Sequence, residues 1–390
     1  MKKLTILPIL LIIFCAVTNA QSPYIHKVFE YRPAPGQFVN ELIDYKENET
    51  YEDILQKVEE AIVGNKKRLI TLGAYGGAIV FGFDHLVENK PGKYDFKIWG
   101  NAYYSNPALF AGSCEPGIVM VSYDANDNGI PDDPWYELAG SEYHKQQTIK
   151  NYEITYYKPD TNKIPTPHPT FPFLIDTSYI KWTDNQGNTG YIAKNSSRKE
   201  PYYPQWVDEE TLVFKGTKLA NNGINEDGTG QFFVQYAYPW GYADNHPNDN
   251  IRSNFNIDWA VDENGNKVNL PGIHFVKVYT GVNQYCGLWG ETSTEVMGAE
   301  DFHIQGIDID VLAVQTEPFP NSRIYYTEGK LYVENLDGCT CTIYNIKGQV
   351  MDSFNIVSSK DKFETNLISG AYFLKVQKQN NSIIFKIIIY

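Results

Sequence analysis

Cysteine, basic residues and long apolar segments are all scarce in this 390-residue chain. It contains 5 cysteines, and 33 Lys and Arg stand against 47 Asp and Glu, which gives a formal net charge of −14. So few cysteines cannot form a dense disulfide framework, and the acidic balance would repel a phosphate backbone. The composition therefore argues against a small disulfide-stabilised scaffold and against nucleic acid as a partner. Because 42% of the residues are hydrophobic and 21% are charged, we expect two or three globular domains.

Common enzyme motifs are also missing. The seven histidines show no spacing typical of a zinc site, and no nucleophile elbow, dinucleotide-binding motif or phosphate-binding loop occurs. Two acid pairs, Glu291 with Glu295 or Glu137 with Glu142, could supply the carboxylates of a glycosidase. Because such pairs arise by chance among 47 acids, we expect them on the solvated surface. A secreted glycan-active hydrolase is thus the alternative function, and a non-enzymatic binding protein is preferred.

The first 20 residues have the pattern of a secretory signal peptide. Two lysines precede an apolar run from Leu4 to Val17, and small residues stand before a predicted cleavage point at Gln21. The run is shorter than the roughly 20 residues that span a bilayer, and no later segment is long enough. We therefore expect an exported protein without a transmembrane span. Export permits disulfides, and a bridge between Cys114 and Cys286 stays open.

Most of the remaining chain predicts short strands. One helix is expected from Thr50 to Val63, where Thr50 and Asp53 have the spacing of a capping box and apolar residues recur with helical periodicity. After it, segments rich in β-branched and aromatic residues alternate with Gly, Pro, Asn and Asp clusters. These segments lie at 70–83, 94–104, 117–124, 151–157, 230–238 and 273–282. The pattern predicts an all-β fold with a β-sandwich as the main domain.

A break in composition at Glu317 to Ser322 separates a short C-terminal segment with four strand signals of its own. We expect a small immunoglobulin-like β-sandwich there. Asn321, IYNIKGQV at 343–350, LISGAYFLKV at 367–376 and FKIII at 385–389 carry a resemblance to the C-terminal sorting domain of Bacteroidetes proteins that use the Por (type IX) secretion route. The resemblance implies a cell-surface or extracellular location and secretion components as partners.

The expected domain plan has four parts. A signal peptide (1–20) precedes an N-terminal segment with the helix (21–68), the main domain (69–316) and the sorting-like domain (317–390). The insertion at 339–341 and the terminal Tyr390 depart from the sorting pattern. An ordinary immunoglobulin-like end module, which would have the same fold, is the alternative.

The segment from Val121 to Tyr143 predicts a calcium site. Asp124, Asn126 and Asn128, followed by Gly129, match the first half of an EF-hand loop. Trp135 replaces the bidentate Glu of such a loop, so we expect a calcium loop between strands, similar to those of thrombospondin-type repeats. The predicted Ca²⁺ ligands are Asp124, Asn126, Asn128, Ile130 through its carbonyl, Asp132, Asp133 and Glu137. A hairpin turn at Asn-Gly is the alternative.

Four further segments carry a second resemblance. LGAYGGAIVFGFDHLVENKPGKYDFKIWGNAY, EPGIVMVSYDANDNGIPDDPWYELAGSEY, FNIDWAV and YTGVNQYCGLWGETSTEV resemble a group of secreted bacterial cell surface proteins with a galactose-binding-like jelly-roll core. The resemblance covers residues 69–304 and implies a jelly-roll main domain. Relatives accompany outer-membrane corrinoid uptake components, so the resemblance makes glycan or corrinoid capture the expected function, with uptake components as further partners.

Two segments combine Trp, Tyr, Gly and Asn, as loops that bind flat ligands do. They are Tyr236 to Asn250 and Val282 to Glu291. Planar rings exposed at a rim can stack on a sugar face or on a macrocycle, and nearby amides can bind its edge. The predicted ligand-binding residues are Trp240, Tyr242, Asn245, Tyr285 and Trp289, on one concave surface. The alternative is that these aromatic residues belong to the core.

Overall fold

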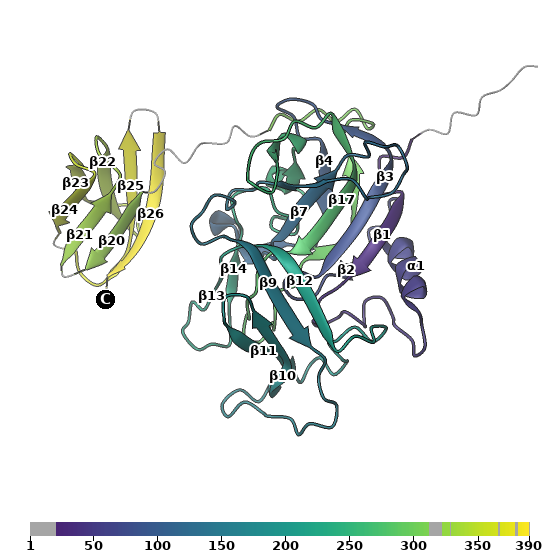
Figure 1. Ribbon diagram of the computed structural model, residues 1–390. Coiled ribbons are helices and arrows are strands. Elements are labelled where there is room, and N and C mark those ends of the chain that lie inside the picture. The colour runs from purple at the N-terminus through teal and green to yellow at the C-terminus, as the bar shows by residue number, and fades with distance from the viewer. Residues whose placement is uncertain (1–20, 312–321, 328, 366, 379–380, 390) are drawn as a thin grey trace, which may run out of the picture. The chain divides into compact units, whose positions relative to one another are not determined.

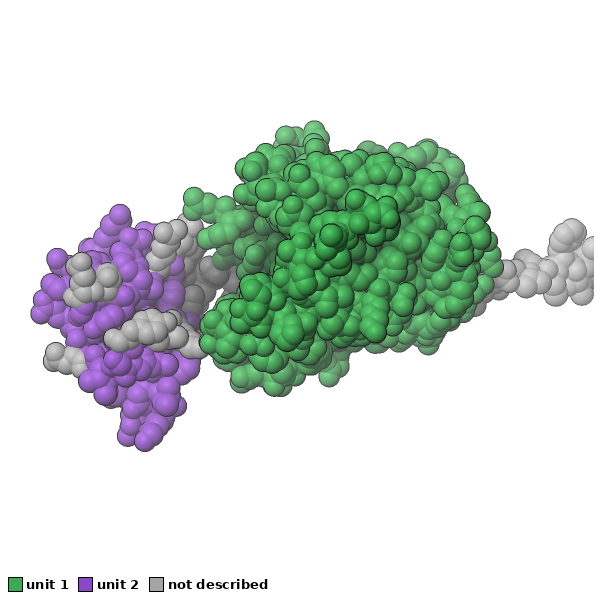
Figure 2. Space-filling model, turned by 90° about the horizontal axis from the view of Figure 1, so that it is seen from below, with its two compact units in different colours: residues 1–311 green, residues 312–390 purple. Residues whose placement is uncertain are grey.

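The computed structural model describes residues 21–311, 322–327, 329–365, 367–378 and 381–389. The chain divides into two compact units, unit 1 (Met1–Val311) and unit 2 (Leu312–Tyr390), coloured separately in Figure 2. The predicted signal peptide lies outside the described residues. Both units consist mainly of antiparallel strands, and the one α-helix of the described residues is α1 (Tyr51–Ile62) (Figure 1). The predicted all-β fold with a single short N-terminal helix is confirmed.

A six-stranded antiparallel sheet forms the centre of unit 1 (Figure 1). Its strands in spatial order are β1 (Lys27–Arg32), β3 (Ala78–Glu88), β17 (Gly272–Thr280), β7 (Gly117–Ser122), β8 (Trp135–Leu138) and β16 (Ala260–Val261). Val276 on β17 pairs with Phe81 on one side and with Val121 on the other, and all three are fully buried. The middle strands read as nearly continuous apolar runs because both of their faces are covered.

Helix α1 begins at a capping box and buries one apolar face. The Thr50 side chain accepts a hydrogen bond from the Asp53 amide, and the Asp53 carboxylate accepts one from the Thr50 amide, so the predicted capping box is present. The buried face of the helix consists of Ile54, Val58, Ala61 and Ile62. These side chains join the same apolar core as the central sheet.

Four smaller sheets complete unit 1. Two of them have four strands: β11 (Thr189–Asn195), β10 (Leu174–Asp184), β9 (Ile149–Tyr157) and β12 (Thr211–Lys218) form one, and β13 (Gly223–Ile224), β14 (Val234–Tyr236), β6 (Ala111–Ser113) and β5 (Tyr103–Asn106) form the other. The other two are β15 (Asn254–Phe255), β4 (Phe96–Trp99) and β19 (Gly298–Asp301), and the pair β18 (Glu295–Val296) and β2 (Ile70–Thr71). Short 3-10 turns are η1 (Pro107–Leu109), η2 (Ile251–Ser253) and η3 (Ile257–Trp259). The jelly-roll topology implied by the resemblance stays a prediction.

Unit 2 contains two sheets around one apolar core. The strands are β20 (Arg323–Thr327), β21 (Lys330–Glu334) and β24 (Lys360–Glu364) in one sheet, and β23 (Val350–Asn355), β22 (Thr340–Asn345), β25 (Gly370–Lys378) and β26 (Asn381–Ile389) in the other. Leu331 and Val333 from the first sheet and Ile343, Leu374 and Val376 from the second are almost fully buried. Buried residues alternate with more accessible ones along β21 and β22, which is the period expected for strands with one face on a core.

The four cysteines of the described residues are free thiols. Cys114, Cys286, Cys339 and Cys341 are all buried, and the bridge considered between Cys114 and Cys286 does not form. Burial raises the pKa of Cys114 and of Cys286 to about 12. Because the thiolate is the reactive form, these side chains act as small apolar residues.

Candidate functional site

A cavity of about 290 Å³ lies in unit 1 between segments far apart in the sequence. Its volume is at the lower limit of pockets that hold small molecules. The carbon-rich part of its wall comes from Phe38, Leu42, Leu69, Tyr103 and Trp289. The polar part comes from Gln37, Asn101, Ser113, Gln235 and Ser293, together with the acids Glu115, Glu291 and Glu295.

A tight turn directs Trp289 outward and Glu291 inward. The Cys286 amide donates to the Gly290 carbonyl at 2.6 Å, and Gly287 and Gly290 have φ angles of +63° and +85°. Glycine adopts these angles without the steric penalty of other residues. The Trp289 side chain is consequently 60% exposed, whereas Glu291 is only 8% exposed.

Gln37, in the loop after β1, holds this turn in place. Its amide and its side-chain Nε2 both donate to the Glu291 carboxylate, and Nε2 also donates to the Trp289 carbonyl at 2.8 Å. The loop and the turn approach so closely that a Cβ on Gly36 would lie 2.9 Å from Glu291 Oε1. The positions of Trp289 and Glu291 are therefore fixed by backbone as well as side-chain contacts.

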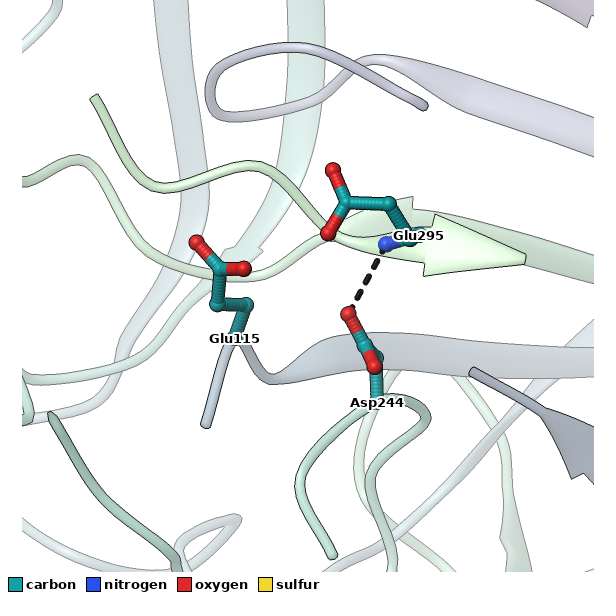
Figure 3. Close-up of side chains that lie close together, drawn as sticks. All are labelled: Glu115, Asp244 and Glu295. Carbon is teal, nitrogen blue, oxygen red and sulfur yellow. Dashed lines mark hydrogen bonds between the residues drawn. The ribbon is translucent and has the colours of Figure 1, made fainter. Parts of the chain in front are cut away.

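Three more carboxyl groups converge beside the turn (Figure 3). Glu115 follows β6, Asp244 precedes η2 and Glu295 begins β18, and one carboxyl oxygen from each lies within 4.8 Å of the others. Figure 3 shows the Glu115 and Glu295 side chains on either side of one space, with Asp244 directed at the backbone of Glu295. We call these three residues the acidic cluster.

Asp244 has a structural task within the acidic cluster. Its Oδ1 accepts the amides of Asn101 and Ala102 at 2.7 and 2.8 Å, and its Oδ2 accepts the Glu295 amide at 2.9 Å. A single carboxylate thus connects three chain segments. Asp244 itself has a φ of +52°, a left-handed conformation in which Asp is one of the more tolerated residues.

Glu115 and Glu295 hydrogen-bond to each other and to groups of the cavity wall. Glu295 Oε1 accepts from the Thr71 hydroxyl at 3.1 Å. Glu115 has long contacts of 3.4 Å with the Ser113 hydroxyl and with the Ser293 amide, and it also hydrogen-bonds with the side chains of Gln235 and Glu295. Glu295 therefore retains capacity for hydrogen bonds with a molecule in the cavity, and Glu115 retains less.

Burial and mutual repulsion raise the pKa values of all four acids. Burial raises the pKa of Glu115, and burial together with the charge of Glu115 raises the pKa of Asp244 and of Glu295 well above the usual range. Burial raises the pKa of Glu291 to about 7. Protonated and ionised forms of Glu291 are thus both accessible near neutral pH, so this side of the cavity can donate or accept a proton.

The structure brings only one of the five predicted ligand-binding residues to this cavity, and that residue is Trp289. Tyr285 is partly buried in the same turn. Trp240 is half-buried against Trp259, with ring centroids 4.6 Å apart. The aromatic residues of the two predicted loops therefore do not both line this cavity.

Tyr242 and Asn245 lie in the interior. Tyr242 is 2% exposed, and its hydroxyl accepts the Glu142 amide at 2.9 Å. Asn245 is fully buried, and its side chain makes two hydrogen bonds with the backbone of Tyr238. These side chains stabilise their loop and are not available at a rim.

The side chains of the predicted calcium loop form hydrogen bonds with other groups of the same loop. Asp124 accepts the amides of Asn128 and Gly129, and Asn128 accepts the amide of Ile130. The side-chain amides of Asn126 and Asn128 donate to Asp132, and Asp133 accepts the Ala125 amide. Burial opposes the change, but the backbone hydrogen bonds from Gly129 and Asn128 lower the pKa of Asp124.

Among the residues that the structure describes, the acidic cluster is the only place where three acids have oxygen atoms within 4.8 Å of one another. The carboxylates of the calcium loop therefore lie farther apart than those of the acidic cluster. Glu137, on β8, instead receives a hydrogen bond from the Thr217 hydroxyl at 2.5 Å and pairs with Lys150 at 3.6 Å. Calcium binding by the loop remains a prediction.

Glu291 and Glu295 correct one expectation from the sequence. They were expected on the solvated surface, but they are 8% and 6% exposed and line the cavity. Glu115, Asp244, Gln37 and Gln235 were not predicted at all. No local motif marks these four, because only the folded chain brings them together.

The C-terminal unit has a recognisable family. Residues 319–390 match the family described as secretion system C-terminal sorting domain. The protein is therefore exported by type IX secretion to the cell surface or the extracellular space. In the described part of the chain, no helix has the length and apolar character needed to cross a membrane.

Comparisons with curated proteins and with solved structures add little about unit 1. No curated protein matches the chain. Among solved structures, the adhesin domain of Epf from Streptococcus pyogenes is similar over 94% of this chain and 99% of its own length, with 7% identity and a TM-score of 0.14. A TM-score this low carries no argument about fold or ligand. The resemblance of unit 1 to secreted cell surface proteins stays a prediction.

Proposed function

We propose that unit 1 is the ligand-binding part of an exported surface protein, and that the cavity beside Trp289 binds a sugar ring of a glycan. The observation that supports this proposal is the exposed Trp289 side chain at a cavity lined with buried hydrogen-bonding groups. An aromatic face can stack on a sugar ring, and polar groups behind it can bind the hydroxyls. Tyr103, 54% exposed, adds a second aromatic side chain to the wall.

Cavity size favours a glycan over a corrinoid. A volume of about 290 Å³ accommodates about one sugar ring. A corrin macrocycle with its side chains is several times larger than a sugar ring and would have to lie mostly outside. Corrinoid binding is therefore an outcome that the experiment can reveal and not the function that we propose.

A glycan array followed by titration calorimetry of the mature protein tests this proposal. Trp289→Ala should weaken binding about tenfold, because an aromatic contact contributes about 1.5 kcal/mol. Tyr191→Ala is the matched control, since Tyr191 is 48% exposed on β11 and does not line the cavity. Equal affinity of parent and Trp289→Ala, or binding of corrinoids with no binding of glycans, would contradict the proposal.

A glycan-active hydrolase is the second candidate. The observation that favours it is the pair of buried acids Glu291 and Glu295 in one cavity, with the pKa of Glu291 at about 7. A carboxyl with a pKa near the working pH can act as general acid. Release of new reducing ends from a bound glycan, abolished in Glu291→Gln, would establish hydrolysis. Binding without release would leave the protein a binding protein.

We also propose that the Asp124 loop holds a structural Ca²⁺ ion. Six oxygen-bearing side chains between Asp124 and Asp133, in an exported protein, support the proposal. Its test is the calcium dependence of the melting temperature given in the Discussion.

A further inference from the structure

The cavity contains several carboxyl groups and no basic group that opposes them. Glu115, Glu291 and Glu295 line it, and Asp244 lies within 4.8 Å of Glu115 and Glu295. No Lys, Arg or His is among the described residues that line the cavity. None of the four carboxyl groups pairs with a basic side chain in the described part of the chain.

Hydrogen-bond donors of the cavity wall are largely used within the protein. Gln37 Nε2 donates to Glu291 and to the Trp289 carbonyl, and Gln235 Nε2 donates to the Thr292 hydroxyl. Remaining acceptor capacity lies mainly on the carboxyl group of Glu295, whose side-chain partners are the Thr71 hydroxyl and Glu115. A matching ligand group is therefore rich in donors and positively charged.

An aromatic face accompanies these acceptors. The indole of Trp289 is 60% exposed at the same cavity. A cation over the face of Trp is attracted by the ring quadrupole. The cavity wall thus offers the Trp289 indole as a stacking surface for a ring. The indole face and the carboxyl groups can both attract a cation.

We propose that this cavity selects a ring ligand with a protonated amine, such as a hexosamine unit with a free amino group, over neutral and acidic sugars. The inference rests on the proposed function, glycan binding. An ammonium group brings three donors and one positive charge, so it satisfies carboxylates that are costly to bury unpaired. An acidic sugar would add a further like charge and be repelled.

Proton balance gives the proposal a second observable. Without a ligand, the carboxyl groups retain protons because burial and repulsion raise their pKa values. When the ammonium enters, a carboxyl O–H bond breaks, the proton passes to the buffer, and the carboxylate accepts an N–H from the ligand. Binding should therefore release protons, and it should strengthen as the pH rises toward the pKa of Glu291, about 7.

Calorimetry with three oligosaccharides of equal length tests this inference. The probes are trimers of glucosamine, N-acetylglucosamine and glucose, each titrated into the mature protein at pH 5.5 and 6.5. Two buffers with different ionisation enthalpies report proton release, EDTA removes metal ions, and 0.3 M salt screens the net charge of −14. We expect the glucosamine trimer to bind at least tenfold more tightly than the glucose trimer at pH 6.5, with a smaller advantage at pH 5.5 and a net release of protons.

Two variants locate the effect. Glu295→Gln and Glu291→Gln should each reduce the preference for the amine about tenfold, whereas Glu263→Gln, at an exposed position away from the cavity, should leave it unchanged. Tryptophan fluorescence and melting temperature establish that each variant is folded. If both variants fail to fold, the proton release and pH dependence of the parent decide the question.

Each other outcome overturns a stated claim. Equal or tighter binding of the glucose trimer overturns the amine preference and leaves glycan binding intact. If the amine preference persists in both Glu variants, its cause lies outside the cavity and the inference is overturned. If EDTA abolishes binding, the carboxylates hold a metal ion, and the inference is likewise overturned. Absence of binding by every array glycan contradicts the proposed function itself.

Discussion

Glu291→Gln removes one buried acid and preserves its shape, so its effect on stability can be worked out from the structure. Burial raises the pKa of Glu291 from its ordinary value of 4.5 to about 7. The folded chain therefore holds a proton at pH values where the unfolded chain has released it. The free energy of unfolding must fall as the pH rises from about 4.5 to about 7, by about 3 kcal/mol at 1.36 kcal/mol per pH unit. Below pH 4.5 both states are protonated, and the destabilisation is absent.

Urea unfolding at pH 5 and pH 8 measures this effect. Tryptophan fluorescence reports on unit 1 alone, because all seven tryptophans precede residue 312. Between the two pH values, the parent should lose about 2 to 3 kcal/mol more stability than Glu291→Gln, whereas Glu263→Gln should parallel the parent. Parallel pH profiles for the parent and Glu291→Gln would refute the reasoning, since they would mean that Glu291 ionises as easily in the folded chain as in the unfolded one.

Three further substitutions, one of them with a control substitution, test the cavity and the predicted calcium loop. Gly290→Ala should cost about 2 to 3 kcal/mol in urea unfolding, because its Cβ would lie 1.9 Å from Gln37 Nε2 at a φ of +85°. Gly92→Ala, at a φ of +74° with open space around it, should cost less, and equal losses would show that the contact with Gln37 is unimportant. Asp244→Ala should cost about 3 kcal/mol or more, since three backbone amides lose their acceptor, and a loss under 1 kcal/mol would contradict its connecting role. Millimolar Ca²⁺ should raise the melting temperature of the parent but not of Asp124→Ala, and no shift in the parent would favour the hairpin turn.

Local signals explain why the secondary structure could be predicted. Thr50 and Asp53 determine the start of α1 through bonds between near neighbours, and apolar spacing determines its buried face. Strands such as β17 are marked by β-branched and aromatic composition, which fits a pleated, half-buried surface. These properties are encoded within a few residues and survive in any fold that contains them.

The candidate site could not be predicted from composition, because tertiary structure brings its residues together. Glu291 and Glu295 are four residues apart in a polar segment, and only the turn at Gly290 and the start of β18 direct them inward. Glu115 meets them through the connection between β6 and β7, which no short pattern indicates. Tyr242 was predicted at an exposed rim but is buried. An aromatic residue in a Gly-rich and Asn-rich segment is as compatible with the interior of the protein as with the rim of a binding site.

The contacts that form the cavity join the two ends of unit 1. The Gln37 to Glu291 hydrogen bonds connect residues 254 positions apart, and those from Asn101 to Asp244 span 143 positions. Loop closure over such distances is entropically costly and slow, so these contacts form late in folding. A nascent chain has no complete cavity until residue 295 has been synthesised and the β2–β18 pair has closed. A glycan that occupies the cavity would therefore recognise only fully assembled unit 1, and retention on an immobilised glycan would separate correctly folded molecules from misfolded ones.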